Sequence, residues 1–562
     1  MSERDEAPRG EMGQYFQKTL PSWIGALTYL SLTTLNLKAS GWGRLYLSGA
    51  ARSMSLNWSN WFFASYDPLG SLTVEKPPLP LWIQSLMVKI FGMRPMSIIL
   101  PSALLGALLI WVVTKRLSNT YGSLIAGVGG ILLATMPGLV ALGRTNNADI
   151  YTIFFGAMAF IVITGGTKHR EMVAGVLLGS AFLSKGMFAT FPMVACFTYV
   201  FLINLKTGYL MSVKKTTIFL TTWVLSWVWW PLIVMYSDPN NRPYVAHTNN
   251  NNPFEQFFGW GSIGGPKWPE SNPEGFGGPI GIGRIFYGGG DQLYWILSLS
   301  LLGGILLYRK KSREVKIQTV SLYLWLVGFT LIYCFTDRVV HEYYVAMGAV
   351  PALFLAMGVI EKAILERGGV YWRVAVLGVL GMSFVYMRDH VWLLSLFLVI
   401  VIGAYLVERG GFEKLRAIGV LLVMVGSLSW GVSGVFSQPN DWNPVARPFE
   451  KWPRNEDLIP QKYYETAESS LRSGSYLMMV PSYGYAEEAV LRGKPVLPAG
   501  GFNGGEQKSM NAEKLSSLVQ NQKLRFVLRS KIHSYNKETT QWIEKNCKEV
   551  HQDETTSLVD CE

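Results

Sequence analysis

Three ionisable residues, Asp67, Glu75 and Lys76, lie in a short segment between two long apolar runs, and Pro77 and Pro78 follow them directly. A carboxylate can take a proton from a hydroxyl group, and an ammonium group can hold a phosphate oxygen. If the apolar runs span a membrane, such residues cost free energy when they face lipid. The segment therefore indicates a polar site at the mouth of a membrane domain.

Three further clusters share this composition: Arg144-Thr-Asn-Asn-Ala-Asp149, Ser184-Lys185-Gly186, and Asp337-Arg338 followed by His341-Glu-Tyr-Tyr344. Each has a plainer explanation, because Asp149 could cap the next helix, the tyrosines could anchor the membrane interface, and Glu75-Lys76 could be surface charge. Four such clusters on one side of the membrane, with none comparable on the other, favour one shared site. The candidate catalytic residues are Asp67, Glu75 and Asp149. The other candidate site residues, for binding a substrate, are Lys76, Arg144, Asn146, Asn147, Lys185, His341, Tyr343 and Tyr344.

The apolar residues of the 562-residue chain occur in uncharged blocks. Blocks of this length are typical of helices that cross a bilayer, where the backbone must satisfy its own hydrogen bonds. We predict a polytopic α-helical membrane protein with about thirteen spans. They lie near residues 21–38, 95–114, 121–140, 150–166, 172–184, 188–205, 216–236, 293–308, 317–335, 343–360, 374–387, 390–407 and 417–434.

Basic residues are concentrated in every second loop, which predicts that these loops are cytoplasmic. They are Lys115-Arg116, Lys168 with Arg170, Lys206 with Lys214-Lys215, Arg309 to Lys316, Lys362 with Arg367 and Arg373, and Arg409 with Lys414 and Arg416. The chain is then a multi-pass protein of the cytoplasmic membrane. Residues 1–20 form a cytoplasmic segment that is not a cleaved signal. Residues 21–434 form the membrane domain with exterior loops 39–94 and 237–292, and residues 435–562 form an exterior domain.

The net charge of +12 does not indicate nucleic-acid binding. The segment from residue 435 onward carries 16 basic and 17 acidic residues, so the excess positive charge belongs to the membrane domain. There it reflects topology rather than a nucleic-acid surface.

The C-terminal segment changes character, because strand-like runs at 475–480, 495–497 and 524–528 alternate with helical runs at 485–492, 511–521 and 537–547. This order predicts a small α/β domain with a parallel sheet. The stretch Gly500 to Gly505 lacks the spacing of nucleotide-binding loops, so a turn is the better interpretation. Cys547 and Cys561 share this exterior domain, where a disulfide is permitted, although their spacing alone does not establish one. Cys196 and Cys334 lie in predicted spans as buried apolar residues.

The long loop 237–292 combines glycine, asparagine and proline with aromatic residues such as Phe257 and Trp260. A loop of this length is usually a functional lid or disordered. The interleaved aromatic residues favour a lid over a site, and the alternative is a tether with aromatic residues at the membrane interface.

Three motifs in this order resemble those of a known class: Glu75-Lys-Pro-Pro-Leu79, Arg144-x-Asn-Asn-x-Asp149 and His341-x-Tyr-Tyr344. The chain resembles the polyprenyl-phosphate-sugar-dependent glycosyltransferases of the GT-C class, and more narrowly the bacterial relatives of protein O-mannosyltransferases and of the lipid A aminoarabinose transferase. The segments Arg242 to Asn252 and Gly493-Lys-Pro-Val to Gly500-Gly-Phe-Asn-Gly resemble a bacterial subgroup with an exterior α/β domain.

The resemblance implies a sugar donor on a polyprenyl phosphate, a carboxylate base in the first exterior loop, and inversion at the anomeric carbon. The family's Asp-Glu pair after the first span is absent here, where the chain reads Gly41-Trp-Gly-Arg-Leu-Tyr-Leu47. The base must then be Asp67, Glu75 or Asp149, or else the chemistry differs from that of the family. We predict Asp67, because Pro68 and Gly70 favour a turn that presents it. The resemblance assigns the other candidate residues named above to the phosphate and sugar of the donor. No cofactor is required, no metal-ligand set is predicted, and a divalent cation is compatible with the sequence.

We therefore predict an inverting membrane glycosyltransferase, mannosyltransferase-like, whose acceptor is an envelope glycan, a lipid or a protein. Two other functions stay open at this point. A transporter of lipid-linked sugars would require an internal repeat and polar residues at mid-span, neither of which is evident. A catalytically silent protein of envelope glycan assembly would explain the missing Asp-Glu pair.

Overall fold

The computed structural model describes residues 7–248, 250–259, 277–310, 312–366, 369–389, 391–409, 413–437, 442–448, 458–501 and 509–562. The centre of the predicted lid, 260–276, and most of the glycine-rich stretch, 502–508, lie outside the described residues.

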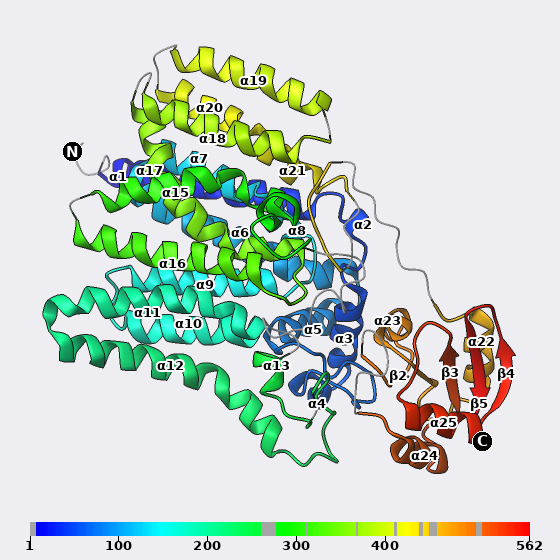
Figure 1. Cartoon of the computed structure of the whole chain (residues 1–562). Helices are drawn as coiled ribbons and strands as arrows, with labels where there is room; N and C mark the ends of the chain where they lie inside the picture. Colours follow the sequence, from blue (N-terminus) through cyan, green and yellow to red (C-terminus); the bar gives the residue numbers. More distant parts are fainter. Residues whose placement is uncertain are drawn as a thin grey trace, which may run out of the picture.

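Most of the chain forms one bundle of helices that lie side by side, from α12 at one edge to α19 at the other (Figure 1). Its helices are α1 (Ala7–Thr34), α6 (Pro95–Tyr121), α7 (Ser123–Ala134), α8 (Pro137–Gly143), α9 (Asp149–Ile163), α10 (Arg170–Lys185), α11 (Thr190–Asn204), α12 (Tyr209–Tyr236), α15 (Leu297–Tyr308), α16 (Arg313–Phe335), α17 (Ala349–Leu365), α18 (Val370–Tyr386), α19 (Val391–Arg409), α20 (Glu413–Val423) and α21 (Val425–Ser433). Short helices connect them: α2 (Leu37–Ser40), α3 (Leu45–Leu56), α4 (Trp58–Phe62), α5 (Leu79–Phe91), α13 (Glu255–Phe258), α14 (Arg284–Tyr287) and the 3-10 helices Gly186–Ala189, Leu205–Thr207, Gly290–Gln292, Tyr294–Ile296 and Glu342–Gly348.

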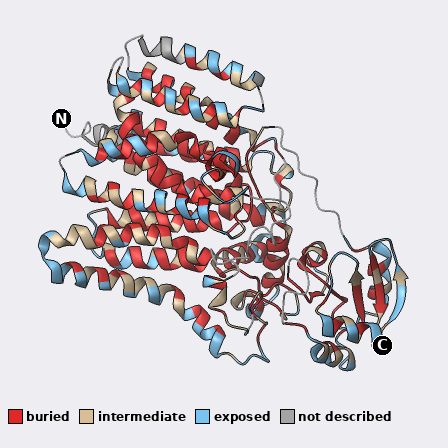
Figure 2. Cartoon of the chain, viewed as in Figure 1, coloured by how far each residue is buried: buried red, intermediate tan, exposed pale blue. Residues whose placement is uncertain are grey.

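The bundle has the composition of a membrane protein. Among the described residues, five helices are long and apolar enough to cross a bilayer, or up to seven if each of two bent pairs counts as one span. Buried residues fill the middle of the bundle, whereas exposed ones line the outer sides of α12 and α19 (Figure 2). Large apolar side chains are exposed on α12, among them Leu225 and Ile233, as expected for a face toward lipid.

These features confirm the predicted polytopic helical membrane protein. The figure of thirteen spans stays a prediction, because several of the predicted runs form helices of only 15 to 17 residues, such as α9 and α18. A straight crossing requires about 20 residues.

The C-terminal segment folds around a five-stranded sheet in the order β2-β1-β3-β5-β4. Its strands are β1 (Met478–Val480), β2 (Val496–Pro498), β3 (Phe526–Ser530), β4 (Lys548–Gln552) and β5 (Thr556–Asp560), and its helices are α22 (Gln461–Ser469), α23 (Tyr483–Leu491), α24 (Ala512–Gln520) and α25 (Lys537–Asn546). β1 pairs in parallel with β2 and β3, as predicted.

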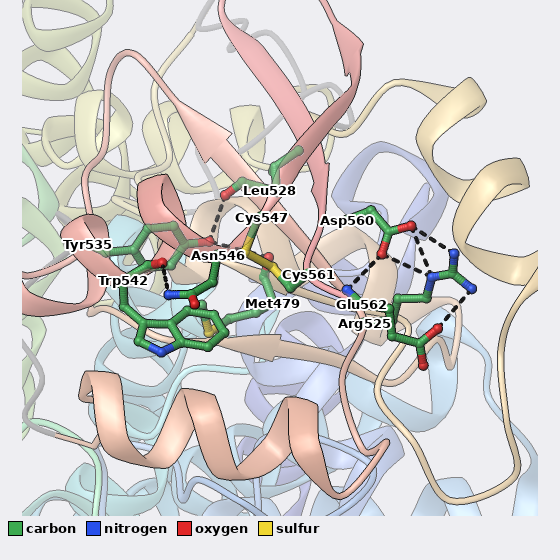
Figure 3. The surroundings of a disulfide bond; sticks show 10 residues. All are labelled: Met479, Arg525, Leu528, Tyr535, Trp542, Asn546, Cys547, Asp560, Cys561 and Glu562. Atoms are coloured by element: carbon green, nitrogen blue, oxygen red, sulfur yellow. Dashed lines mark hydrogen bonds and ion pairs between the residues drawn. A yellow bond between two sulfur atoms is a disulfide. The ribbon is translucent and has the colours of Figure 1, made fainter.

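The prediction of an entirely parallel sheet is wrong, because β4 and β5 form a hairpin that joins β3 in the antiparallel direction. A hairpin needs only a short turn and no crossover helix. A disulfide links Cys547 at the start of β4 to Cys561 after β5 (Figure 3).

The C-terminal unit packs against the first large loop of the bundle, where α23 lies beside α3 (Figure 1). Nη1 of Arg52 in α3 donates a hydrogen bond of 2.9 Å to the carbonyl oxygen of Leu491. The rings of Tyr46, Tyr66 and Tyr483 lie 4.6 to 4.9 Å apart, centroid to centroid, and all three are buried. The C-terminal unit is therefore in direct contact with the loop that carries the first charged cluster.

Candidate active site

Glu75 and Lys76 precede α5, whose first turn contains proline, a residue that suits a helix start because its missing N–H would have no partner there. Lys76 Nζ lies 2.6 Å from Glu75 Oε1, and the Glu75 side chain is buried. Burial acts to raise the pKa of Glu75, but the charges of Lys76 and Arg44 act against it and lower this pKa to about 2. Glu75 is therefore ionised at neutral pH.

A second ion pair joins Asp149, the first residue of α9, to Lys185, the last residue of α10. Lys185 Nζ lies 2.5 Å from Asp149 Oδ1, and only 1% and 2% of the two side chains are exposed. The same ammonium group lies 3.8 Å from the ring centre of Tyr344 and 4.2 Å from that of Phe188. Such burial is costly unless the charges are paired, so this arrangement is strongly constrained.

The backbone turns sharply after Lys185. Gly186 has a φ of +51°, and a Cβ atom there would lie 2.5 Å from the carbonyl oxygen of Phe257. A side chain larger than hydrogen would thus be strained and would push Phe257 away. Gly186 allows the described part of the long loop to lie directly over the end of α10.

That loop also covers the segment leading to Glu75. Tyr244 forms a parallel β-bridge with Leu72. The backbone N–H of Ala246 donates to Thr73 Oγ1 at 3.0 Å, and Gln256 Nε2 donates to the carbonyl oxygen of Val74 at 2.5 Å. The first described part of the loop therefore lies on this segment, and the lid itself stays a prediction.

His341 forms a further wall of the site with the two tyrosines that follow it. Its ring centre lies 5.4 Å from that of Tyr343 and 5.3 Å from that of Tyr344. Burial, and then the positive charges of Arg44, Lys185 and Lys76, hold the pKa of His341 well below its usual value. The imidazole is therefore neutral, in an electropositive surrounding.

The structure thus brings most of the predicted site residues together. They are Glu75, Lys76, Asp149, Lys185, His341, Tyr343 and Tyr344, and we refer to them as the charged cluster. Asn147 precedes Asp149 by two positions, is buried, and has an Nδ2 with no hydrogen-bond partner among the described residues. It therefore remains a candidate for binding a ligand.

Asp67 lies outside the charged cluster, and its assignment as the base stays a prediction. Its carboxylate accepts hydrogen bonds from the backbone N–H groups of Leu69 (3.1 Å), Ser71 (2.8 Å) and Leu72 (2.8 Å). It also accepts one of 2.9 Å from the hydroxyl of Tyr476 in the C-terminal unit. The predicted turn does form, but it directs the carboxylate into its own backbone.

Arg144 and Asn146 make hydrogen bonds that hold the fold, and their assignment to the phosphate or sugar of the donor stays a prediction. Arg144 donates to the carbonyl oxygens of Leu32 (2.7 Å), Leu35 (2.7 Å) and Asn36 (3.1 Å), and so satisfies the end of α1. Asn146 Oδ1 accepts a hydrogen bond of 2.9 Å from the Arg44 N–H, and its Nδ2 donates to Ser48 Oγ at 2.8 Å. It therefore orders the start of α3.

Sequence reasoning missed Arg44 and His247. Arg44 is buried, and its Cζ lies 4.5 Å from the ring centre of Trp442. Its charge acts on both Glu75 and His341. His247 is half-buried, and desolvation, partly opposed by the charge of Glu75, lowers its pKa to about 4. One signal was available for Arg44, because it stands in the segment where the related class carries acids.

An apolar pocket adjoins the charged cluster between α11 and α16. Phe188 and Tyr344, which contact Lys185, also line this pocket, together with Phe191, Phe329, Ile332 and Arg338. Within the part of the chain that the structure describes, no group of three His, Cys, Asp or Glu side chains is arranged to hold a metal ion.

Comparisons with known proteins show what the chain is similar to. Residues 75–231 match the family model Dolichyl-phosphate-mannose-protein mannosyltransferase, and residues 464–546 match the model Putative mannosyltransferase YkcB-like, C-terminal. The chain is 25% identical to Putative mannosyltransferase YycA of Bacillus subtilis, over 93% of each chain. It is 23% identical to Putative mannosyltransferase YkcB of the same organism, over 92% of this chain and 89% of the relative.

The crystal structure of ArnT from Cupriavidus metallidurans bound to undecaprenyl phosphate superposes with a TM-score of 0.54, at 13% identity and over 98% of both chains. This likeness shows the fold. The comparisons confirm the resemblance that the motifs indicate: over nearly its whole length the chain is similar to these bacterial mannosyltransferase relatives, and it has the fold of a GT-C-type membrane glycosyltransferase.

Proposed function

We propose that the chain transfers a sugar from a polyprenyl phosphate to a hydroxyl group of an acceptor, with inversion at the anomeric carbon. The observation that carries the proposal is the charged cluster, in which the buried ammonium group of Lys185 and the half-buried one of Lys76 lie with Glu75 and Asp149 beside an apolar pocket. A lipid-linked phosphate requires a positively charged site for the phosphate directly beside an apolar site for the lipid.

The donor would place its phosphate at the ammonium groups and the start of its lipid in the apolar pocket. Charge-assisted hydrogen bonds from lysine hold phosphate oxygens well. Arg44, which is buried, would add a further positive charge beside the phosphate. The ArnT structure of the same fold is bound to undecaprenyl phosphate, which supports a polyprenyl phosphate as the carrier.

We assign the base to Glu75 rather than Asp67. Glu75 Oε1 is paired with Lys76, and the hydroxyl of Tyr46 also acts on the Glu75 carboxylate, so Glu75 lies in the charged cluster with both a cation and a hydroxyl beside it. When Lys76 turns toward the donor phosphate, Glu75 loses its nearest positive charge and becomes a stronger base. Asp149 is bound to Lys185 and serves to orient it.

The reaction is a single displacement at the anomeric carbon. The acceptor hydroxyl oxygen forms a bond to the anomeric carbon while the bond from that carbon to the phosphate oxygen breaks. The phosphate keeps the electron pair and stays on the lipid, and Glu75 takes the hydroxyl proton. Lys76, Lys185 and Arg44 stabilise the charge that develops on the leaving phosphate.

We propose that the site lies on the outer face of the cytoplasmic membrane, with the N-terminus inside and residues 435–562 outside. The support is the alternation of basic loops, and the disulfide agrees with an exterior C-terminal unit. The sugar is proposed to be mannose or a related hexose or pentose. The acceptor is an envelope glycan, a lipid or a protein.

The test uses the full-length chain in lipid nanodiscs with radiolabelled mannosyl phosphoryl undecaprenol as the donor. Wild-type protein should release undecaprenyl phosphate and transfer label to a membrane extract. Glu75→Gln should bind the donor with unchanged affinity but transfer nothing, because it keeps the shape and removes the base. Asp67→Asn should retain transfer in the fraction that folds.

If Glu75→Gln stays active while Asp149→Asn is inactive, the base is Asp149. Binding without any transfer by the wild type, with several sugar donors, would instead favour a silent assembly protein. Movement of intact donor across the bilayer would favour a transporter. The proposed sugar transfer needs no metal ion, so addition of EDTA should leave its rate unchanged.

A further inference from the structure

A second pocket, of about 390 Å³, lies apart from the apolar pocket. It is formed by α14 and the 3-10 helix after it, by the end of α18, and by residues 447–448. A volume of this size is typical of small-molecule sites. None of the residues assigned above to base or phosphate lines it.

The walls of this pocket alternate aromatic rings with paired charges. Arg447 forms a two-pronged ion pair with Asp291, at 2.6 Å from Nε to Oδ2 and 2.8 Å from Nη2 to Oδ1, and its Nη2 also contacts Glu342. The guanidinium of Arg388 lies 4.9 Å from the ring centre of Tyr287. Tyr287 is 60% exposed, so one face of an aromatic ring is available to a ligand.

The balance of charge indicates the class of ligand. Arg447 is compensated by Asp291 and Glu342, and Arg388 lies 3.5 Å from the carboxylate of Asp389. An anionic polymer would find no excess positive charge here. A ligand with many hydroxyl groups can both donate to the carboxylates and accept from the guanidinium groups, and its C–H faces can pack on tyrosine.

Residues 442–448 lead from this pocket to Arg44 and Glu342, which lie beside the charged cluster. At one end the Trp442 ring lies over Arg44, and at the other Arg447 lines the pocket. Between them Asn443 Oδ1 accepts a hydrogen bond of 2.9 Å from the N–H of Glu342, the neighbour of His341. Five residue steps span at most about 18 Å, which a short chain of sugars can bridge.

We propose that this pocket binds a neutral saccharide of the acceptor, so that a more distant hydroxyl of the same glycan reaches Glu75. The assignment of this saccharide to the acceptor rests on the proposed function, whereas binding of a saccharide in the pocket does not. The saccharide belongs either to a free glycan or to the head group of a glycolipid, and both present the same chemistry to the pocket.

The experiment measures binding directly, without transfer. The full-length chain in nanodiscs is titrated with a panel of neutral oligosaccharides of two to four mannose, glucose or galactose units, followed by saturation-transfer NMR. At least one member should bind to wild type. Tyr287→Ala and Arg388→Ala should each weaken that binding about tenfold, the loss of one good contact.

A matched control is Tyr236→Ala, which removes an 81% exposed tyrosine at the end of α12 and should leave the affinity unchanged. Donor binding should be unaffected in both pocket variants. A second arm presents the bound saccharide on a lipid in the nanodisc, and tighter binding there identifies a glycolipid, whereas equal binding identifies a free glycan.

Three results would overturn the proposal: no oligosaccharide of the panel binds, the pocket variants bind as well as wild type, or a charged phosphoglycerol oligomer binds in preference. Failure of the donor assay with intact saccharide binding would instead overturn the proposed function alone.

Discussion

The hydroxyl of Tyr476 donates a hydrogen bond of 2.9 Å to Oδ1 of Asp67, and thereby joins the C-terminal unit to the loop that ends in Glu75. Both side chains are buried. The other hydrogen bonds of Asp67 come from its own turn, so this contact holds the turn as a whole rather than one side chain. The C-terminal unit therefore helps to position the proposed base.

Tyr476→Phe should loosen the turn that contains Asp67. The loss of a buried hydrogen bond to a carboxylate costs about 1–3 kcal/mol. Hydrogen–deuterium exchange should accelerate at residues 68–72, and turnover should fall while donor affinity is kept. The control Tyr463→Phe removes a hydroxyl that donates to the Thr556 carbonyl oxygen inside the C-terminal unit, and should leave residues 68–72 unchanged. Equal exchange in Tyr476→Phe and wild type would contradict this role.

The ion pair of Lys185 and Asp149 should show the behaviour of a buried pair. Asp149→Leu alone leaves a buried ammonium group and should lower the free energy of unfolding by about 3–5 kcal/mol. The double variant Asp149→Leu with Lys185→Met should regain much of that stability but no transfer activity, because the phosphate contact is lost. Thermal unfolding in nanodiscs measures the first effect, and the donor assay measures the second.

An exposed ion pair serves as the comparison. Lys362 lies in α17 and Glu366 directly after it, and their side chains are 36% and 44% exposed. Lys362→Met should change the stability by less than about 1 kcal/mol. If the double variant in the buried pair is as unstable as the single one, the pair does not act as a unit.

Much of the fold could be predicted from the sequence, because long apolar runs and alternating strands and helices are local signals. The predicted helices α23, α24 and α25 and strands β1, β2 and β3 all form. The hairpin of β4 and β5 was missed because its strands carry polar residues such as Lys548 and Gln552, which do not alternate clearly with apolar ones.

The site was predicted in part for a physical reason. Ionisable residues beside apolar runs identify Glu75, Lys76, Asp149 and Lys185. The sequence does not tell which carboxylate accepts hydrogen bonds from the backbone of its own turn, as Asp67 does. The partner of Asp67 is 409 residues away, and Arg144 binds carbonyl oxygens more than 100 residues earlier. Such pairings follow from the packing of distant elements and leave no local pattern.

Lys76→Ala should weaken the donor interaction. Removal of a charge-assisted contact to the phosphate should cost about 1.5–3 kcal/mol, seen as a higher KM for the lipid donor and a lower kcat. Lys76→Arg should restore the activity only in part, because the guanidinium is planar and larger. Full activity of Lys76→Ala in the nanodisc assay would show that Lys76 merely neutralises Glu75.

The stability of the protein should decrease as the pH falls from 6.5 to about 4. Burial lowers the pKa of His247 from 6.5 to about 4, so the unfolded chain takes up a proton in this range that the folded chain does not. Uptake by the unfolded state alone favours unfolding, with a contribution of about 3 kcal/mol across the interval.

His247→Asn should reduce this slope, because asparagine does not titrate and tolerates the left-handed backbone that His247 adopts at a φ of 57°. The measurement is chemical unfolding at intervals between pH 7 and pH 4. A slope unchanged in His247→Asn would assign the effect to other groups, of which His341 is the first to test.

The disulfide between Cys547 and Cys561 should both stabilise the C-terminal unit and report its side of the membrane. The bond joins residues 14 apart, and closing a loop of this size contributes about 3 kcal/mol through the unfolded state. Cys547→Ser with Cys561→Ser should therefore lower the Tm of the C-terminal unit, whereas Cys196→Ser and Cys334→Ser alter buried cysteines in the bundle and serve as controls.

The same disulfide reports the side of the membrane. In intact cells, a membrane-impermeant maleimide should label Cys547 and Cys561 only after treatment with an impermeant reductant, because an exterior domain keeps its disulfide. Labelling that requires permeabilised cells would place the C-terminal unit in the cytoplasm and overturn the proposed topology.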